Sequence, residues 1–219
     1  MSAYSPKRRV GRPATEDRQQ ARTRILTSAL DLFANRGIAG VPDSAIAQSA
    51  GVTPAMVRYY FADREALLDA LFDEHIRTFV FTIWKIDELC WQRSLDVLSS
   101  LAHGIVEAAQ TSPWLPNLWI REVVSETGLL RSRIIALLSE LPMRRLAELV
   151  RREQQQGLVP SAIQPGLIFV SMIGLTMMPL AINLWRNLPD NERLGPSEIV
   201  HHALALLGYG LYGQPNATL

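Results

Sequence analysis

Arg58, Tyr59 and Tyr60 are consecutive residues that place a cation and two hydroxyl groups on one short segment. Neighbouring side chains on a helix diverge by about 100°, so these three cannot all face one apolar core. An arginine can pair with a phosphate or with O6 and N7 of guanine, and tyrosine hydroxyls can donate hydrogen bonds to phosphate oxygens. The residue types therefore favour contact with a nucleic acid.

The sequence around these residues predicts two short helices separated by a glycine turn. The first spans 43–50 with Asp43 as its N-cap, and the second spans 54–61 with Thr53 as N-cap and Pro54 at the first helical position. Two short helices joined in this way form a helix-turn-helix, whose second helix can lie in the major groove of DNA.

The second helix has two faces. Val57 and Phe61 are four residues apart, so they share one face and should pack against the first helix. The outward side keeps Ala55 and Met56, either of which can touch a thymine methyl group, together with the arginine and the tyrosines.

The rest of the chain also follows a helical period, and no strand pattern is present. Apolar residues at Ile25, Ala29 and Phe33 predict a helix that starts near Asp17 and ends at Gly37. Another helix should run from a cap at Asp63 to about residue 80. Further helices are predicted over 93–111, a short piece to 126, 128–156 with an interruption or kink at Pro142, 165–186 and 196–210. The predicted fold class is all-α, with an N-terminal three-helix domain that contains the helix-turn-helix and a C-terminal helical domain.

Charge is unevenly distributed, although the net charge is only +1. Residues 1–64 hold ten Lys and Arg against five Asp and Glu, so the remainder of the chain is acidic. We interpret 1–18 as a basic flexible arm. Arg12 lies in its Gly-Arg-Pro stretch, and both a plain solvated tail and an arm that enters the minor groove stay open.

The segment that carries the helix-turn-helix resembles the N-terminal domain of the TetR family of transcriptional regulators, over residues 19–79 with the motif at 42–61. The resemblance rests on the Ala29, Leu32, Phe33, Gly37 series, the Ile46-Ala47 and Ala50-Gly51-Val52 series, the Tyr60-Phe61 pair, and Arg64-Glu65 followed by Leu67-Leu68. It implies DNA contacts from Ser44, Thr53, Ala55, Met56, Arg58, Tyr59 and Tyr60, and a phosphate contact from Arg64.

Three positions depart from the family pattern. Val41-Pro42-Asp43 replaces the usual Thr-Thr or Thr-Ser before the first short helix, Ala55-Met56 replaces glycine-threonine, and Arg58 stands where tyrosine is common. We expect these changes to alter which operator is read.

The resemblance also implies what residues 80–219 do. They should form a ligand-binding and dimerisation domain that pairs with a second copy through the helices 165–186 and 196–210. The expected partner is a near-palindromic double-stranded DNA operator, and the expected activity is repression relieved by an unknown, apolar small-molecule effector. A candidate effector pocket contains Trp84, Trp114, Trp119, Arg121, Phe169 and Met177. The alternatives are a regulator controlled by a protein partner or by no ligand, and a helical small-molecule-binding protein or enzyme.

Several features that suggest other functions carry little weight. No hydrolase elbow, Walker loop or zinc motif is present. Residues 208–213 fit the letters G-x-G-x-x-G, but no strand precedes them, so we interpret them as a helix end. We therefore expect no enzyme activity, cofactor or metal. The uncharged stretch 166–184 is long enough to span a membrane, but a core and dimer helix is the better interpretation in a chain with a DNA-binding segment. A single cysteine, Cys90, and an N-terminus without a signal-peptide pattern favour a cytoplasmic protein.

Overall fold

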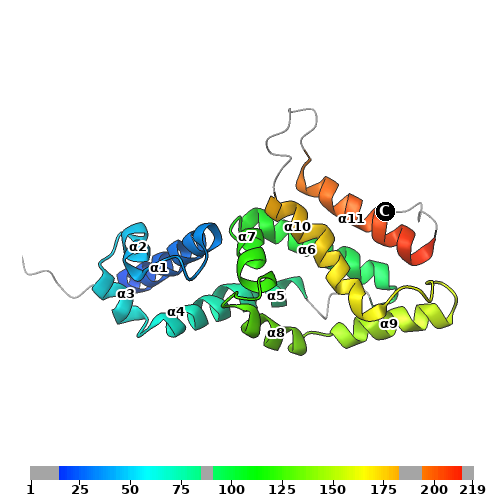
Figure 1. Ribbon diagram of the computed structural model, residues 1–219, viewed down its shortest axis with the longest axis horizontal. Coiled ribbons are helices and arrows are strands. Elements are labelled where there is room, and N and C mark those ends of the chain that lie inside the picture. The colour runs from blue at the N-terminus through cyan, green and yellow to red at the C-terminus, as the bar shows by residue number, and fades with distance from the viewer. Residues whose placement is uncertain (1–14, 85–90, 183–193, 214–219) are drawn as a thin grey trace, which may run out of the picture.

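The computed structural model describes residues 15–84, 91–182 and 194–213, and over these ranges it contains helices and no strand. The expected all-α fold class is confirmed. The helices lie in an elongated arrangement, with α1, α2 and α3 at one end and α9 and α11 at the other (Figure 1). In chain order they are α1 (Thr15–Arg36), α2 (Asp43–Ala50), α3 (Pro54–Tyr60), α4 (Arg64–Leu71), η1 (Phe72–Arg77), α5 (Thr78–Ile83), α6 (Ser94–Thr111), α7 (Leu115–Trp119), η2 (Ile120–Val124), α8 (Arg131–Glu140), α9 (Met143–Gln155), η3 (Pro165–Leu167), α10 (Ile168–Ile182) and α11 (Pro196–Tyr212).

The helices of the helix-turn-helix end and begin at residues that suit the turns between them. Gly37 closes α1 with φ of 76°, a left-handed conformation that glycine adopts without steric cost, and its N–H donates to the carbonyl of Phe33 at 2.8 Å. Gly51 ends α2 in the same way, with φ of 65°. α3 then starts within three residues, so α2 and α3 are held in a tight corner.

The expected N-cap at Asp43 is wrong. Pro42 occupies the N-cap position of α2 and makes no side-chain cap, and Asp43 is the first helical residue. The Asp43 carboxylate instead accepts a hydrogen bond from Arg64 at 3.2 Å, because the folded chain brings the start of α4 against the start of α2.

The helix predicted from Asp63 to about residue 80 is present but is not α-helical throughout. Asp63 caps α4 as expected, accepting from the N–H of Ala66 at 2.8 Å. A π-helical segment, η1, then separates α4 from α5. Such segments insert one extra residue per turn and often occur at functional sites. Here η1 lies where the N-terminal helices meet the rest of the molecule (Figure 1).

The C-terminal helices pack around α6. It buries Leu98, Leu101 and Ala102 completely and contacts both α10 and α11. The predicted break at Pro142 divides 128–156 into α8 and α9, as expected, and the segment 183–186 of the predicted helix 165–186 lies outside the described residues.

Two hydrophobic clusters form the core. The first lies among the N-terminal helices and also contains residues from later helices. Besides residues of α1 to η1, it contains Leu118 of α7, Leu130, and Ile134 and Leu137 of α8. The second cluster joins α6, α9, α10 and α11. Because α7 and α8 contribute to the first cluster, they connect the N-terminal helices to the C-terminal ones.

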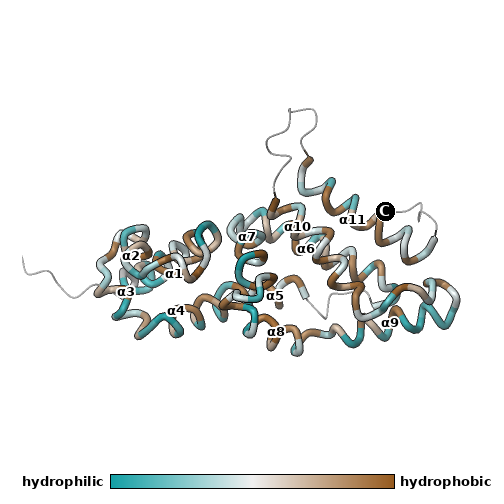
Figure 2. The backbone as a smooth tube through the Cα atoms, viewed as in Figure 1, coloured by the Kyte–Doolittle hydropathy of each residue, from teal (hydrophilic) through white to brown (hydrophobic). Residues whose placement is uncertain are grey.

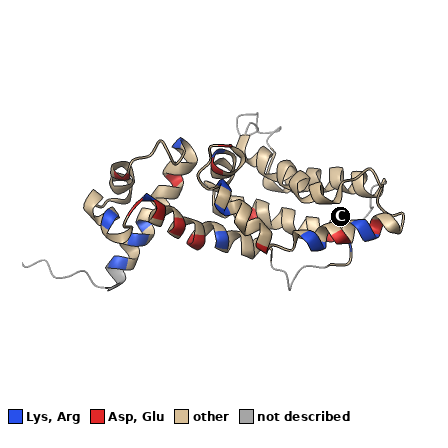
Figure 3. Cartoon of the chain, turned by 60° about the horizontal axis from the view of Figure 1, so that its bottom comes forward, with Lys and Arg blue, Asp and Glu red and all other residues tan. Residues whose placement is uncertain are grey.

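Charged and apolar residues are also distributed differently between the N-terminal and the C-terminal helices. α10 is strongly apolar and contains no charged residue, and in Figure 2 much of it is coloured as hydrophobic. In Figure 3 the ribbon is blue at several places on the N-terminal helices and red along α4 and η1. Among the described residues, one helical stretch, Pro165–Ile182, is long and apolar enough to cross a membrane by length and composition, and 28% of it is buried.

Candidate nucleic-acid interface and apolar cavity

The outward face of α3 is set by its cap and by two buried anchors. The Thr53 hydroxyl oxygen accepts from the N–H of Met56 at 3.3 Å, which leaves the hydroxyl hydrogen able to donate to a ligand. Val57 and Phe61 are buried, so α3 is fixed against α2 and α1 by one side only.

The predicted DNA-contacting residues of α3 lie on the opposite side. Ala55, Arg58 and Tyr59 are exposed, and Tyr59 keeps 70% of its surface accessible. Tyr60 is half-buried, with its ring edge-on to that of Tyr59 at 5.3 Å between centroids. The Tyr59 hydroxyl and the Arg58 guanidinium are exposed side by side, and both can donate hydrogen bonds to phosphate oxygens.

The other residues predicted to contact DNA differ in how exposed they are. Ser44 is exposed in the first turn of α2, the helix that precedes α3 in the chain. Met56 of α3 is half-buried. Arg12 lies outside the described residues. The structure therefore brings Ser44, Thr53 and the outward residues of α3 to one end of the molecule.

Arg64 points into its own domain. Its guanidinium donates to the carbonyl oxygens of Ile38 at 2.7 Å and Val41 at 2.9 Å, besides Asp43. The same group lies over the ring of Phe33, 4.5 Å from the centroid. These contacts fix the α1–α2 connection to α4. The phosphate contact implied by the resemblance stays a prediction.

Arg22 supports α3 from behind. Its guanidinium lies 5.2 Å from the centroid of the Phe61 ring and donates to Glu74 of η1 at 2.6 Å. The hydrogen bond from Arg22 lowers the pKa of Glu74 below its ordinary value. An ion pair thus joins α1, the end of α3 and η1.

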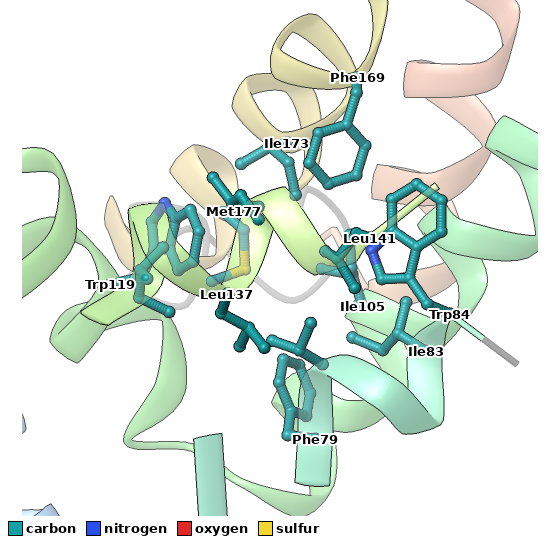
Figure 4. Close-up of a pocket in the computed structure, with 13 residues that line it drawn as sticks. Phe79, Ile83, Trp84, Ile105, Trp119, Leu137, Leu141, Phe169, Ile173 and Met177 are labelled. Atoms are coloured by element: carbon teal, nitrogen blue, oxygen red, sulfur yellow. The ribbon is translucent and has the colours of Figure 1, made fainter. Parts of the chain in front are cut away.

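The C-terminal part contains an apolar cavity of about 40 Å³. Figure 4 shows side chains from α5, α6, α7, α8 and α10 directed at a common space. All thirteen residues that line it are apolar: Phe79, Val80, Ile83, Trp84, Ile105, Trp119, Ile134, Leu137, Leu138, Leu141, Phe169, Ile173 and Met177. The Trp84 and Phe169 rings lie 5.2 Å apart and close one end.

A wider groove of about 250 Å³ adjoins this cavity. Both spaces are lined by the same five residues: Trp119, Leu138, Phe169, Ile173 and Met177. The groove is also apolar. The cavity itself is smaller than the roughly 300–1,000 Å³ of ligand sites for drug-sized molecules, so a ligand must displace some of the shared side chains.

Four of the six residues predicted for an effector pocket line the cavity: Trp84, Trp119, Phe169 and Met177. Trp114 packs between the two hydrophobic clusters, and Arg121 is exposed on η2. The sequence did not single out Phe79 and Ile83 as pocket residues. Their i, i+4 spacing, with Trp84 following, was the available signal for an inward face of α5.

The described residues contain no group of three or more His, Cys, Asp or Glu placed to hold a metal ion. Cys90 lies outside the described ranges. The stretch 208–213, which matches the letters of a dinucleotide-binding motif, forms the last turn and the C-cap of α11, with Gly213 at φ of 65°.

Residues 25–71 match the family model described as bacterial regulatory proteins, tetR family. This range runs from the middle of α1 through the helix-turn-helix to the end of α4. Residues 25–71 therefore form a DNA-binding segment of the tetR type. This segment contains the helix-turn-helix formed by α2 and α3.

Solved structures share the fold along nearly the whole chain. The ketosteroid transcriptional regulator KstR2 of Mycobacterium tuberculosis superposes with a TM-score of 0.67 and 18% identity, over 94% of this chain and 100% of that one. AibR in complex with isovaleryl coenzyme A and operator DNA gives 0.66 and 19%, over 88% and 100%. FadR from Bacillus subtilis in complex with stearoyl-CoA gives 0.64 and 19%, over 87% and 99%. No curated protein matches this chain by sequence.

Proposed function

We propose that this TetR-family protein is a homodimeric repressor that binds a near-palindromic operator and is released from it by an apolar small molecule. The observation that carries the DNA-binding half is the outward face of α3, where Ala55, Arg58 and Tyr59 are exposed while Val57 and Phe61 are buried. A helix anchored on one side and exposed on the other can be inserted into a major groove without rearranging its own domain.

The surface of α10 and α11 supports dimerisation. Leu167, Val170, Met178 and Ile182 recur at helical spacing and keep between 43% and 59% of their surface accessible. Gly174 lies in the same stripe, and a Cβ added there would meet no other atom within 4 Å. Leu206 and Tyr209 of α11 continue the apolar surface, at 48% and 53% exposure. In a chain with a DNA-binding segment, such a surface is explained by a second copy that packs its own α10 and α11 against it. We take the protein to be cytoplasmic.

Dimerisation gives DNA recognition its geometry. Two α3 helices must stand about 34–36 Å apart, or a multiple of that, to enter successive major grooves on one side of the duplex. A ligand that prefers another spacing lowers DNA affinity by the difference between its affinities for the two conformations.

The apolar cavity and groove define the effector class that we propose. Neither is lined by a charged side chain, so the buried part of the effector is a hydrocarbon chain or ring body. Two of the similar structures hold acyl thioesters of coenzyme A, isovaleryl and stearoyl, and a third is named for ketosteroids. Straight-chain acyl-CoA thioesters and a steroid are therefore the first probes.

The test has two stages. The protein is used to select duplexes from fragmented genomic DNA, and the selected duplex is then titrated in the presence of butanoyl-CoA, dodecanoyl-CoA, octadecanoyl-CoA or a steroid. Recovery of a near-palindromic duplex and loss of affinity with an apolar probe support the proposal. Recovery of no preferred duplex contradicts the DNA-binding half. A preferred duplex whose affinity no probe changes contradicts the effector half and favours a protein partner or no ligand.

A further inference from the structure

Glu122 is a buried carboxylate on the segment that borders both the cavity and the DNA-binding domain. Its residue is only 5% exposed. Just before it, Trp119 lines both the cavity and the groove, and Ile120 lines the groove. Leu118 is buried in the hydrophobic cluster of the helix-turn-helix domain. α7 and η2 therefore contact the effector space on one side and the DNA-binding domain on the other.

The Glu122 carboxylate reaches across this boundary. One oxygen, Oε1, accepts from the backbone N–H of Ile38 at 2.8 Å, 84 residues away in the chain. The other, Oε2, accepts from the N–H of Leu129 at 3.0 Å. Both acceptors of a buried anion are thus satisfied by main-chain donors, and neither points into the cavity.

Two glycines make these approaches possible. A Cβ on Gly128 would lie 2.3 Å from the carbonyl oxygen of Glu122, so only glycine lets the following turn fold back and present the N–H of Leu129. Gly37, at φ of 76°, turns the chain so that the next N–H, that of Ile38, faces Glu122. A Cβ there would stand 3.5 Å from Oε1.

The peptide group of Ile38 continues the connection to the helix-turn-helix. Its carbonyl oxygen accepts from Arg64 Nη2 at 2.7 Å, and Arg64 Nη1 donates to Asp43, the first residue of α2. A line of hydrogen bonds therefore runs from η2 through the α1–α2 connection to α2, against which α3 packs.

Other bonds between the two halves are more exposed. Arg133 of α8 pairs with Glu65 and Asp69 of α4, but these carboxylates are 70% and 61% exposed. Exposed ion pairs are screened by water and contribute little, whereas an orphaned buried carboxylate or amide is costly. Displacing Glu122 should therefore perturb the DNA-binding domain more than displacing Arg133.

We propose that Glu122 is the positioning residue through which occupancy of the apolar cavity changes the placement of the helix-turn-helix. When Trp119 and Ile120 shift to admit a ligand, η2 carries Glu122 with them, and the hydrogen bonds through Ile38 and Arg64 move the start of α2. This inference rests on the proposed effector response. It adds a specific route for the coupling, made of a discrete set of contacts.

The test measures coupling rather than stability. The affinity of the selected duplex is measured with and without saturating dodecanoyl-CoA for the wild type, Glu122→Gln, Glu122→Ala and the control Glu126→Gln, an exposed neighbour. Coupling of the usual size changes DNA affinity about 5–150-fold in the wild type and in the control. We expect the ratio to approach one in Glu122→Ala and to be intermediate in Glu122→Gln, which keeps one acceptor oxygen.

Two further measurements separate this role from a general loss of structure. Both Glu122 variants should bind dodecanoyl-CoA alone with an affinity close to wild type and should still prefer the selected duplex, and exchange of the Ile38 amide should be faster. An unchanged ratio in a Glu122→Ala protein that binds both ligands overturns the role of Glu122 while leaving the proposed function intact. A wild type that binds the duplex but does not respond to dodecanoyl-CoA contradicts the acyl-CoA response, and the inference falls with it.

Discussion

The Glu122 carboxylate holds the backbone N–H of Ile38 at 2.8 Å, and so joins a helix that borders the apolar cavity to the end of α1. Neither residue is exposed, and they are 84 positions apart in the chain. This contact makes the cavity and the helix-turn-helix parts of one packed structure. The chain therefore has the physical means to report on cavity occupancy at its DNA-binding end.

Arg58 is the expected source of sequence preference on α3. Arg58→Ala should weaken binding to the selected duplex by about 1–3 kcal/mol and relax the preference at one base pair, because a bidentate contact to guanine is lost. Arg151→Ala, which removes an exposed arginine on α9 at the far end of the molecule, is the matched control and should leave affinity unchanged. Equal loss on all duplexes would instead identify Arg58 as a phosphate contact.

A variant of Arg64 shows whether this residue stabilises the fold or contacts a DNA phosphate. Arg64→Ala removes hydrogen bonds to two carbonyl oxygens and the pairing with Asp43, so we expect the free energy of unfolding to fall by about 1–3 kcal/mol. Thermal unfolding without DNA measures this loss directly. If stability is unchanged and only the salt dependence of DNA binding becomes shallower, Arg64 acts as the phosphate contact that the family resemblance implies.

Leu206 tests the dimer surface. Leu206→Glu places a charge in the centre of the proposed interface and should convert the dimer into a monomer, because an unpaired carboxylate is costly to bury. Light scattering after gel filtration reads out the molar mass. Leu158→Glu is the control, since Leu158 is 53% exposed beyond α9 and outside the proposed interface. A monomeric wild type, or a dimeric Leu206→Glu protein, would contradict the assignment of α10 and α11.

His75 makes stability sensitive to mild acid. It lies in η1, where burial lowers the pKa of the imidazole below its ordinary value. The folded protein therefore disfavours the proton that the unfolded chain accepts near pH 6.5, and stability is lost as the pH falls from about 6.5 through the folded pKa. Glu74 also makes the folded protein less stable as the pH falls, but at lower pH, starting near its ordinary pKa of about 4.3. The reason is that the hydrogen bond from Arg22 lowers the pKa of Glu74 in the folded protein.

Thermal unfolding at several pH values between 7.5 and 5.0 checks this expectation. His75→Gln should flatten the upper part of the profile, whereas His103→Gln, at an exposed site on α6, should not. A wild-type profile that is flat from pH 7.5 to 5.0 would show that burial of His75 has no consequence for stability.

The local elements of the DNA-binding domain could be predicted from the sequence because their signals are local. Thr53 and Pro54 fix the start of α3, and Val57 and Phe61 identify its inner face by spacing alone. Asp43 was assigned the wrong role because a residue 21 positions later, Arg64, competes for its carboxylate. No window of a few residues contains that information.

The features that connect the two halves could not be predicted for the same reason. The apolar spacing through Phe72 and Ile76 is typical of an α-helix, and the π-helical turn of η1 depends on what packs there in the folded chain. Glu122 next to Arg121 suggests a polar group for a pocket, but its carboxylate faces away from the cavity. Its true partner, Ile38, is specified by the packing of α7 on α1.

Hydroxyl-radical footprinting of the selected duplex shows whether α3 reads the DNA. We expect two protected half-sites on one side of the duplex, about 34–36 Å or a multiple of that apart, since both α3 helices of a dimer enter the major groove. Protection should disappear in an Arg58→Ala, Tyr59→Ala double variant that remains folded. A continuous or absent footprint, or one that the double variant leaves unchanged, would contradict the claim that α3 is the DNA-reading element of this protein.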